Sequence, residues 1–366
     1  MPHDGGGAIP NRSAKEGMDL SMVGSARLVT GGVDTHLDVN VAAALDRIGG
    51  LLGVESFPTT VEGNRQLLGW LGGMGRVVQV GVEGTGSYGA SLARFLREAG
   101  VEVLEVDRPN RQERRRKGKN DTVDAIEAAR AAQGRRQLGA AKTKDGNVEA
   151  IRALMVARRS ARDMKIASLN QIRHLGFTAP EEIRQSLQGV SRRLIAKRAA
   201  AMRPRADAGP VIYATKTALR TLGRRVLELD GERKELDKLL NSLLADTAPG
   251  LLSLYGVGKH AAANLLVAAG DNPDRLRSET AWARLCGVSP IEASSGKTVR
   301  HRLNPGGNRQ ANAALWHIVI TRMSSDPRTA VYVERRTKEG RTKKEIIRVL
   351  KRYVAREVYP YIITAV

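Results

Sequence analysis

The sequence predicts an α/β domain followed by a mainly helical region, an α/β plus α architecture. Segments of strand and helix character alternate from residue 26 to residue 138, and the chain from residue 145 onward carries apolar residues at helical spacing. The chain has 366 residues, enough for about two or three domains. Apolar residues make up 42% of it, which is ample for at least one hydrophobic core.

The α/β domain is expected to occupy residues 26–144. Strands and helices follow one another there as strands 27–34, 39–45 and 51–57, a helical run ending near residue 71, strand 76–83, helix 88–99, strand 101–106 and a long last helix. Thr59 and Glu62 have the spacing of a capping box at the first helix, and Asn120 is placed to cap the last one. Three strands in a meander followed by αβ units is the order of an RNase H-like fold.

Residues 145–246 are predicted to be almost wholly helical. Six apolar residues follow coiled-coil spacing there, with Arg233 interrupting the series: Leu222, Val226, Leu229, Leu236, Leu240 and Leu243. The pattern favours a short coiled coil that joins two subunits, and a helix packing inside one chain would give the same spacing.

Two regions are expected after the helical segment. Residues 247–330 form a compact region that begins at Pro249-Gly250. Residues 331–366 form a basic helical tail, in which nine of the eighteen residues 335–352 are Lys or Arg. We expect this tail to contact nucleic acid; a solvated helix face is the alternative.

The charge balance bears on the partner. A formal net charge of +22 favours a polyanion, and nucleic acid is the commonest one. A membrane surface competes, but no stretch approaches the roughly 20 apolar residues that span a bilayer. Aromatic residues are only 4%, so phosphate contacts should dominate over base stacking. Residues 1–25 lack the apolar segment of a secretory signal and are expected to be a disordered leader.

Cysteine and histidine usage narrows the chemistry. Cys286 is the only cysteine, which excludes an intrachain disulfide and zinc fingers built on cysteine pairs. A reducing cytoplasm is the expected location. The six histidines are scattered and show no metal-ligand spacing.

Four acidic residues occupy positions that an RNase H-like fold would bring together. Asp34 lies on the first strand, Glu83 ends the fourth, and Asp121 and Asp124 open the last helix, three residues apart on one helix face. Phosphoryl transfer on DNA uses such a cluster to hold two Mg²⁺ ions about 3.5–4 Å apart. Taken one at a time, each residue could instead be a surface or helix-capping carboxylate. Together they predict a metal site.

Two features beside the carboxylates have competing interpretations. The glycines Gly84, Gly86 and Gly89 follow a strand and open a helix, as in dinucleotide-binding proteins, with Glu105 and Asp107 near the spacing of the ribose-binding acid. We regard this isolated motif as the weaker hypothesis. A basic run before Asp121 could hold a phosphate backbone or be a solvated loop: Arg114, Arg115, Arg116, Lys117 and Lys119.

The region after residue 247 carries two polar turns. The segment around Gly256, Gly258 and Lys259 has the pattern of a helix-hairpin-helix, whose backbone N–H groups can bind a DNA phosphate, or of a plain helical turn. Further on, a Ser-Ser-Gly-Lys loop precedes a run of cations. A hydroxyl among cations can attack a phosphodiester, although most loops of this composition have no catalytic role. The residues concerned are Ser294, Ser295, Lys297, Arg300, His301 and Arg302.

The order of these motifs resembles that of the DEDD transposases of bacterial insertion sequences. The four carboxylates are followed far downstream by Gly-Val-Gly and Ser-Ser-Gly-Lys, and the likeness extends from about Val33 to about Met323. This family includes bridge-RNA-guided recombinases and Piv-type DNA invertases. The resemblance implies a RuvC-like domain at residues 26–144, a helical or coiled-coil middle at 145–246 and a serine-bearing transposase domain at 247–330.

The resemblance also implies an activity and its residues. Asp34, Glu83, Asp121 and Asp124 match the family's ligands for Mg²⁺ or Mn²⁺, and Ser295 matches its serine nucleophile, with Ser294 as the fallback in the doubled serine. Family members form a covalent serine–DNA intermediate and assemble as dimers or tetramers in which the acidic site of one subunit meets the serine of another. Several use a structured guide RNA. The implied partners are therefore element-end and target DNA, and RNA, in the bacterial cytoplasm at the nucleoid. The alternative is a metal-dependent nuclease that forms no covalent intermediate; a non-catalytic nucleic-acid-binding protein is less consistent with four intact carboxylates.

Overall fold

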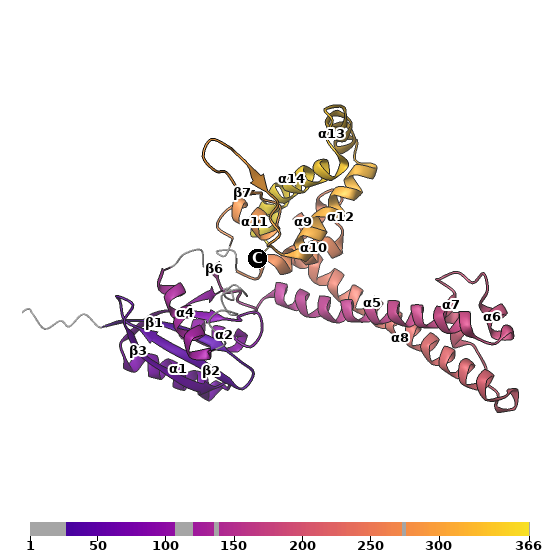
Figure 1. Ribbon diagram of the computed structural model, residues 1–366, viewed down its shortest axis with the longest axis horizontal. Coiled ribbons are helices and arrows are strands. Elements are labelled where there is room, and N and C mark those ends of the chain that lie inside the picture. The colour runs from indigo at the N-terminus through magenta and orange to yellow at the C-terminus, as the bar shows by residue number, and fades with distance from the viewer. Residues whose placement is uncertain (1–26, 107–119, 135–138, 273–275, 366) are drawn as a thin grey trace, which may run out of the picture. The chain divides into compact units, whose positions relative to one another are not determined.

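The computed structural model describes residues 27–106, 120–134, 139–272 and 276–365, and the chain divides into two compact units at residues 138 and 139 (Figure 1). The first unit, which ends at Leu138, has the mixed strands and helices predicted for the front of the chain. Its elements are β1 (Leu28–Thr35), β2 (Val39–Leu45), β3 (Leu51–Pro58), α1 (Val61–Gly73), β4 (Arg76–Glu83), α2 (Ala90–Glu98), β5 (Glu102–Val106) and α4 (Asp121–Gly134).

The sheet of the first unit joins an antiparallel meander to parallel strands. The strand order is β3-β2-β1-β4-β5, with β1 antiparallel to β2, β2 antiparallel to β3, and β4 parallel to both β1 and β5. The mixed α/β prediction is confirmed by this arrangement. One detail was wrong: the N-cap of α1 is Thr60, whose hydroxyl accepts from the Gly63 amide at 3.0 Å, and not Thr59. The cap at Asn120 is confirmed, because its side chain accepts from the Thr122 amide at 3.1 Å.

Glycines at the centre of the sheet decide how closely helices cover it. A Cβ on Gly32 would lie 2.1 Å from the Ala129 nitrogen, and one on Gly81 would lie 2.4 Å from the Ala128 oxygen, so α4 rests directly on β1 and β4. A Cβ on Gly31 would instead meet Leu71 of α1 at 3.0 Å. Because neighbouring strand residues face opposite sides, α4 and α1 cover opposite faces of the sheet.

The second unit is mainly helical. It contains β6 (Gly139–Ala140), α5 (Asn147–Thr178), α6 (Glu181–Leu187), α7 (Ile195–Ala200), η1 (Ala206–Ala208), α8 (Pro210–Thr247), α9 (Pro249–Ser253), α10 (Lys259–Ala269), α11 (Glu279–Leu285), β7 (Ile291–Glu292), β8 (His301–Arg302), α12 (Arg309–Ser325), α13 (Pro327–Lys338) and α14 (Lys343–Ile363). Among the helices in the described ranges, none is both long enough and apolar enough to cross a membrane.

The two long helices α5 and α8 run side by side, with α6 and α7 at their far end (Figure 1). The apolar series predicted for a coiled coil lies on α8 and packs against α5 of the same chain: Val226 shares a core with Ile172, and Leu240 shares one with Ile151. The structure thus uses this seam within one chain, which was the alternative to dimerisation. Arg233, which interrupts the series, bonds to Asp237 at 2.9 Å.

The predicted basic tail belongs to a folded core. Ile346, Leu350 and Val358 of α14 are buried in the same apolar cluster as Trp282 of α11 and Leu315 of α12. Some of its cations are engaged within the chain, since Lys351 donates to the Asn312 side chain at 2.9 Å and Arg352 forms a two-bonded ion pair with Glu279. The apolar face of α14 therefore stabilises the second unit.

Candidate functional site

Two acidic side chains lie next to each other at the ends of β1 and β4. The register pairs Val33 with Val82, so the next residues, Asp34 and Glu83, occupy the same level of neighbouring parallel strands. Both are buried, with exposed fractions of 3% and 4%. The Thr35 hydroxyl donates to the Glu83 carbonyl at 2.8 Å, which fastens the two strand ends to each other.

The same sheet face that receives α4 carries both carboxylates. Gly32 and Gly81 face α4, and side chains two residues further along a strand point to the same side. Asp34 and Glu83 therefore face α4, at the end of the sheet where that helix begins with Asp121. The charges of Asp121 and Asp124 both act on Asp34, so these three carboxylates lie near one another, while Glu83 is placed beside Asp34 by the strand register.

A histidine completes the cluster, and sequence reasoning missed it. His36 Nε2 lies 3.1 Å from Asp34 Oδ2 and 3.4 Å from Asp121 Oδ1. One ligand atom from each of these three residues can lie within 4.8 Å of the others, as metal coordination requires. The signal in the sequence was the Asp34-x-His36 spacing at the end of a buried strand, so the view that the histidines lack metal-ligand spacing was wrong for His36.

Burial and like charge act on Asp34 together. Desolvation raises the pKa of the Asp34 carboxyl above its ordinary value, and the neighbouring Asp124 and Asp121 raise it further, while His36 lowers it. A divalent cation would relieve this repulsion. The carboxylate oxygens alone would suit either Mg²⁺ or Mn²⁺. An imidazole nitrogen from His36 as a further ligand would suit Mn²⁺ better than Mg²⁺. The residues therefore fit a divalent metal.

The glycine motif after β4 is explained by the turn itself. Gly84 has φ +73°, and a Cβ on Gly89 would lie 3.0 Å from the Glu83 carbonyl. Glu105, which could have served as a ribose-binding acid, accepts a hydrogen bond from the buried Thr85 hydroxyl at 2.8 Å. These glycines keep the chain close to Glu83 and need no dinucleotide to account for them.

The basic run before α4 lies outside the described residues, which leave out residues 107–119. Its proposed phosphate contacts stay a prediction for Arg114, Arg115, Arg116, Lys117 and Lys119.

The doubled serine lies in the second unit, on the hairpin formed by β7 and β8. Ser295 and Thr298 exchange two backbone hydrogen bonds of 3.1 Å around Gly296, which has φ +57°. The Ser294 hydroxyl is tied to the opposite strand, because it accepts from the Arg300 amide at 3.2 Å. Ser295 is exposed, and within residues 276–365 its hydroxyl makes no hydrogen bond. The exposed cations Lys297, Arg300 and Arg302 share this hairpin.

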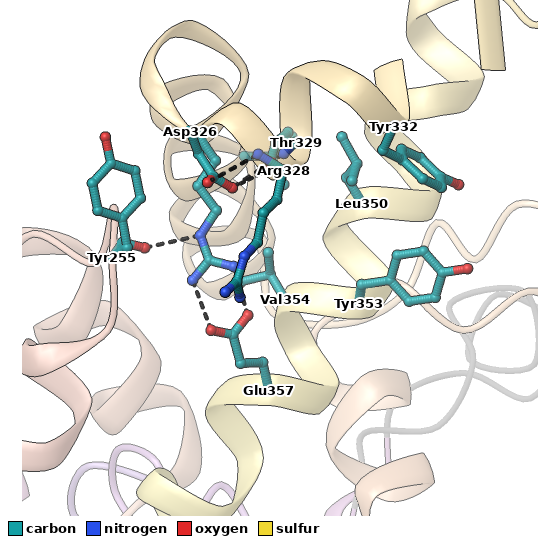
Figure 2. A pocket seen from close by; sticks show the side chains of 11 residues that line it. Tyr255, Asp326, Arg328, Thr329, Tyr332, Leu350, Tyr353, Val354 and Glu357 are labelled. Carbon is teal, nitrogen blue, oxygen red and sulfur yellow. Dashed lines mark hydrogen bonds and ion pairs between the residues drawn. The ribbon is translucent and has the colours of Figure 1, made fainter. Parts of the chain in front are cut away.

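The predicted helical turn is also present, between α9 and α10. Gly256 has φ +78°, and Arg322 of α12 holds the turn by donating to the Tyr255 carbonyl at 2.8 Å. The same guanidinium bonds to Glu357 of α14 at 2.5 and 3.0 Å. Figure 2 shows Tyr255 and Glu357 with the dashed lines that mark these interactions. No side chain among the described residues caps α10, which begins after Gly258 with Lys259.

Comparison with known proteins agrees with this arrangement. Residues 31–175 match a family described as transposase, of the DEDD type, and residues 248–334 match the transposase IS116/IS110/IS902 family. Two separate segments of the chain are thus similar to transposase families of the IS110 type. The first match contains all four carboxylates, and the second contains the serine hairpin and the turn before α10.

A similar protein is found in Streptomyces coelicolor. This protein, described as the insertion element IS110 uncharacterized 43.6 kDa protein, is 33% identical over 114 residues. The matched segment covers 30% of this chain and 28% of the relative's length.

Proposed function

We propose that this chain is a transposase of the IS110 type that cuts and rejoins DNA with a divalent metal and a serine nucleophile. The observation that carries the proposal is the buried pair Asp34 and Glu83 facing the start of α4, where Asp121 and Asp124 lie. Such a buried acidic cluster is unfavourable alone and favourable with a cation. The matches of two segments to transposase families support the same reaction class.

The four carboxylates are proposed to hold Mg²⁺ or Mn²⁺, with His36 beside them. When bound, the metal would neutralise charge that develops on the attacking and leaving oxygens of the phosphodiester. Asp34 and Glu83 are fixed by the sheet, while Asp121 and Asp124 are carried by α4. His36 orients Asp34 through its 3.1 Å contact and links it to Asp121. An imidazole at this place favours Mn²⁺ somewhat more than a purely carboxylate site would.

Ser295 is proposed as the nucleophile. Its oxygen would form a bond to phosphorus, the bond from phosphorus to one sugar oxygen would break, and that oxygen would leave with the serine proton. Attack by a second sugar hydroxyl would reverse these changes and rejoin the strand. Ser295 is favoured over Ser294 because its hydroxyl is exposed at the tip, whereas Ser294 holds the hairpin together. Lys297, Arg300 and Arg302 would hold the phosphate.

The partners proposed are the element ends, the target DNA and a structured guide RNA, with the chain acting as a homo-oligomer. The net charge of +22 is consistent with both nucleic acids. Gly256, Gly258 and Lys259 are proposed to bind a phosphate through the backbone of the turn.

A metal-dependent nuclease is the second candidate, because the acidic cluster lies complete within the first unit, whereas Ser295 lies in the second. Replacement of Asp34 by Ala tests what both candidates share. We expect D34A to lose strand cleavage and to keep DNA binding. Cleavage by D34A at the wild-type rate would contradict the metal site.

A further inference from the structure

The far end of the hairpin formed by α5 and α8, where α6 and α7 lie (Figure 1), carries a concentrated positive charge. Residues 190–226 contain ten Lys or Arg and one acidic residue, Asp207, which gives this stretch a net charge of +9. The whole chain has a net charge of +22, so one tenth of its length carries about two fifths of its net charge. Such a local excess favours a polyanionic partner at this end of the hairpin.

A separate apolar core fixes which side chains point outward at this end. Ile195 and Ala199 of α7 are buried together with Val226 of α8. A Cβ on Gly223 of α8 would lie 2.4 Å from the Ala200 nitrogen, so α7 rests directly on α8. Burial of this face of α7 leaves its other face, which is basic, at the surface beside α8.

Six cations from three neighbouring segments form what we call the distal basic surface. They lie in the turn before α7, on α7 and on α8: Arg192, Arg193, Lys197, Arg198, Arg220 and Arg224. Five of them are exposed, and Arg220 is partly buried. Within the described ranges of the chain, none of the six forms an ion pair or a side-chain hydrogen bond. Their charges are therefore available to a partner.

The acidic residues near this surface are few and bind other cations. Glu182 accepts from Lys216 at 2.6 Å, and Asp207 accepts from Arg205 at 2.5 Å. Neither the segment 191–205 nor the segment 219–227 contains an Asp or a Glu. The close approach of α7 and α8 thus holds unpaired cations near one another, and their mutual repulsion would be relieved by a polyanion.

Two other occupants fit the distal basic surface less well. A second copy of the chain would bring this positive surface against itself in a two-fold contact, and like charges in an interface are unfavourable. A helix that binds a membrane surface places its apolar face in the lipid, but the apolar face of α7 is buried against α8. Contacts from Lys and Arg to backbone phosphates of nucleic acid need no apolar face.

We propose that the distal basic surface binds the phosphate backbone of double-stranded DNA. The inference rests on the proposed function for the choice of DNA, which is the substrate there. Backbone contacts carry no sequence information, so this surface would position a duplex without selecting its sequence. It adds a DNA-binding site on the helical middle of the chain to the contacts proposed for Lys259 and for the hairpin of β7 and β8.

The test is the salt dependence of DNA binding by the full chain. Fluorescence anisotropy with a labelled duplex, without divalent metal, gives the affinity at several salt concentrations, and the slope of log affinity against log salt reports the number of phosphate contacts. We expect Lys197→Gln combined with Arg224→Gln to reduce this slope by about 2, one for each lost contact. Lys234→Gln combined with Lys238→Gln is the matched control, because it removes the same charge from exposed positions of α8 outside this surface and should leave the slope close to that of wild type.

A charge-preserving variant protects the test against misfolding, since Lys197→Arg combined with Arg224→Lys should keep the wild-type slope. An unchanged slope in K197Q/R224Q would overturn the proposal, and so would an equal fall in K234Q/K238Q, which would reflect net charge alone. A fall in slope with an RNA duplex and none with DNA would overturn the choice of DNA. D34A should keep the wild-type slope while losing strand cleavage, so failure of the metal site and failure of this surface give different results.

Discussion

Gly32 provides a test of the site that touches none of its ligands. In Gly32→Ala the new Cβ would lie 2.1 Å from the Ala129 nitrogen and 2.4 Å from the Ala125 oxygen, both of them backbone atoms of α4. Backbone atoms cannot turn aside, so α4 has to retreat by about 1 Å to reach an ordinary contact. Overpacking of this kind costs about 1–3 kcal/mol of unfolding free energy.

The retreat of α4 would also move its first residues, Asp121 and Asp124, away from Asp34. We expect G32A to bind Mn²⁺ more weakly and to cleave DNA about a hundredfold more slowly, since about 1 Å of misplacement has that effect. Thermal unfolding and Mn²⁺ titration measure the two consequences. Gly69→Ala is the matched control, because its Cβ meets nothing within 4 Å on α1 and should preserve both properties. Wild-type Mn²⁺ affinity and stability in G32A would refute the reasoning.

Three other substitutions or treatments give further expectations. Asp34→Asn should raise the unfolding temperature of the metal-free chain near neutral pH by about 2–4 °C, because burial raises the pKa of Asp34 and makes its ionisation unfavourable. The same substitution should abolish the stabilisation of the chain by Mn²⁺. Equal stabilisation of D34N and wild type by Mn²⁺ would contradict this. The hydrogen bond from Lys165 lowers the pKa of Asp230 to about 2. The ionised Asp230 therefore stabilises the folded chain fully at pH values above the ordinary aspartate pKa, and this stabilisation is lost as the pH falls through about 2. Asp230→Asn should therefore lower stability at neutral pH by about 1 kcal/mol and flatten its decline in acid, which denaturant melts at several pH values would show. Burial raises the pKa of the Cys286 thiol far above its ordinary range, so a thiol reagent should label it only after unfolding, and labelling of the native chain would count against that burial.

The sequence was most informative where local pattern and chemistry coincide. The strands carrying Asp34 and Glu83 were predictable, because each has a mostly apolar interior without charge that leads directly to the acid. The cap at Asn120 was predictable for the same local reason. Thr59 and Thr60 are adjacent and both can cap a helix, so only the backbone geometry places the cap at Thr60.

What the sequence left undecided depends on contacts between distant segments. The apolar series on α8 has the same spacing whether its partner is a second subunit or α5, and only packing decides for α5. The contact between His36 and Asp121 could not be predicted from sequence, because the two positions are 85 residues apart. It depends on Gly32, which lets α4 and its Asp121 lie directly on β1. The roles of Ser294 and Ser295 separate only when the Arg300 amide is seen to bond to Ser294.

The central claim is that Ser295 forms a covalent bond to DNA in a reaction that the carboxylates support. Mass spectrometry of the purified chain with Mg²⁺, element-end DNA and any co-purifying RNA tests it most directly. We predict a DNA adduct on Ser295 that is absent in Ser295→Ala and in Asp34→Ala but present in Ser294→Ala. Cleaved DNA without any protein adduct would contradict the claim and would leave a metal-dependent nuclease in which Ser295 is only a loop residue.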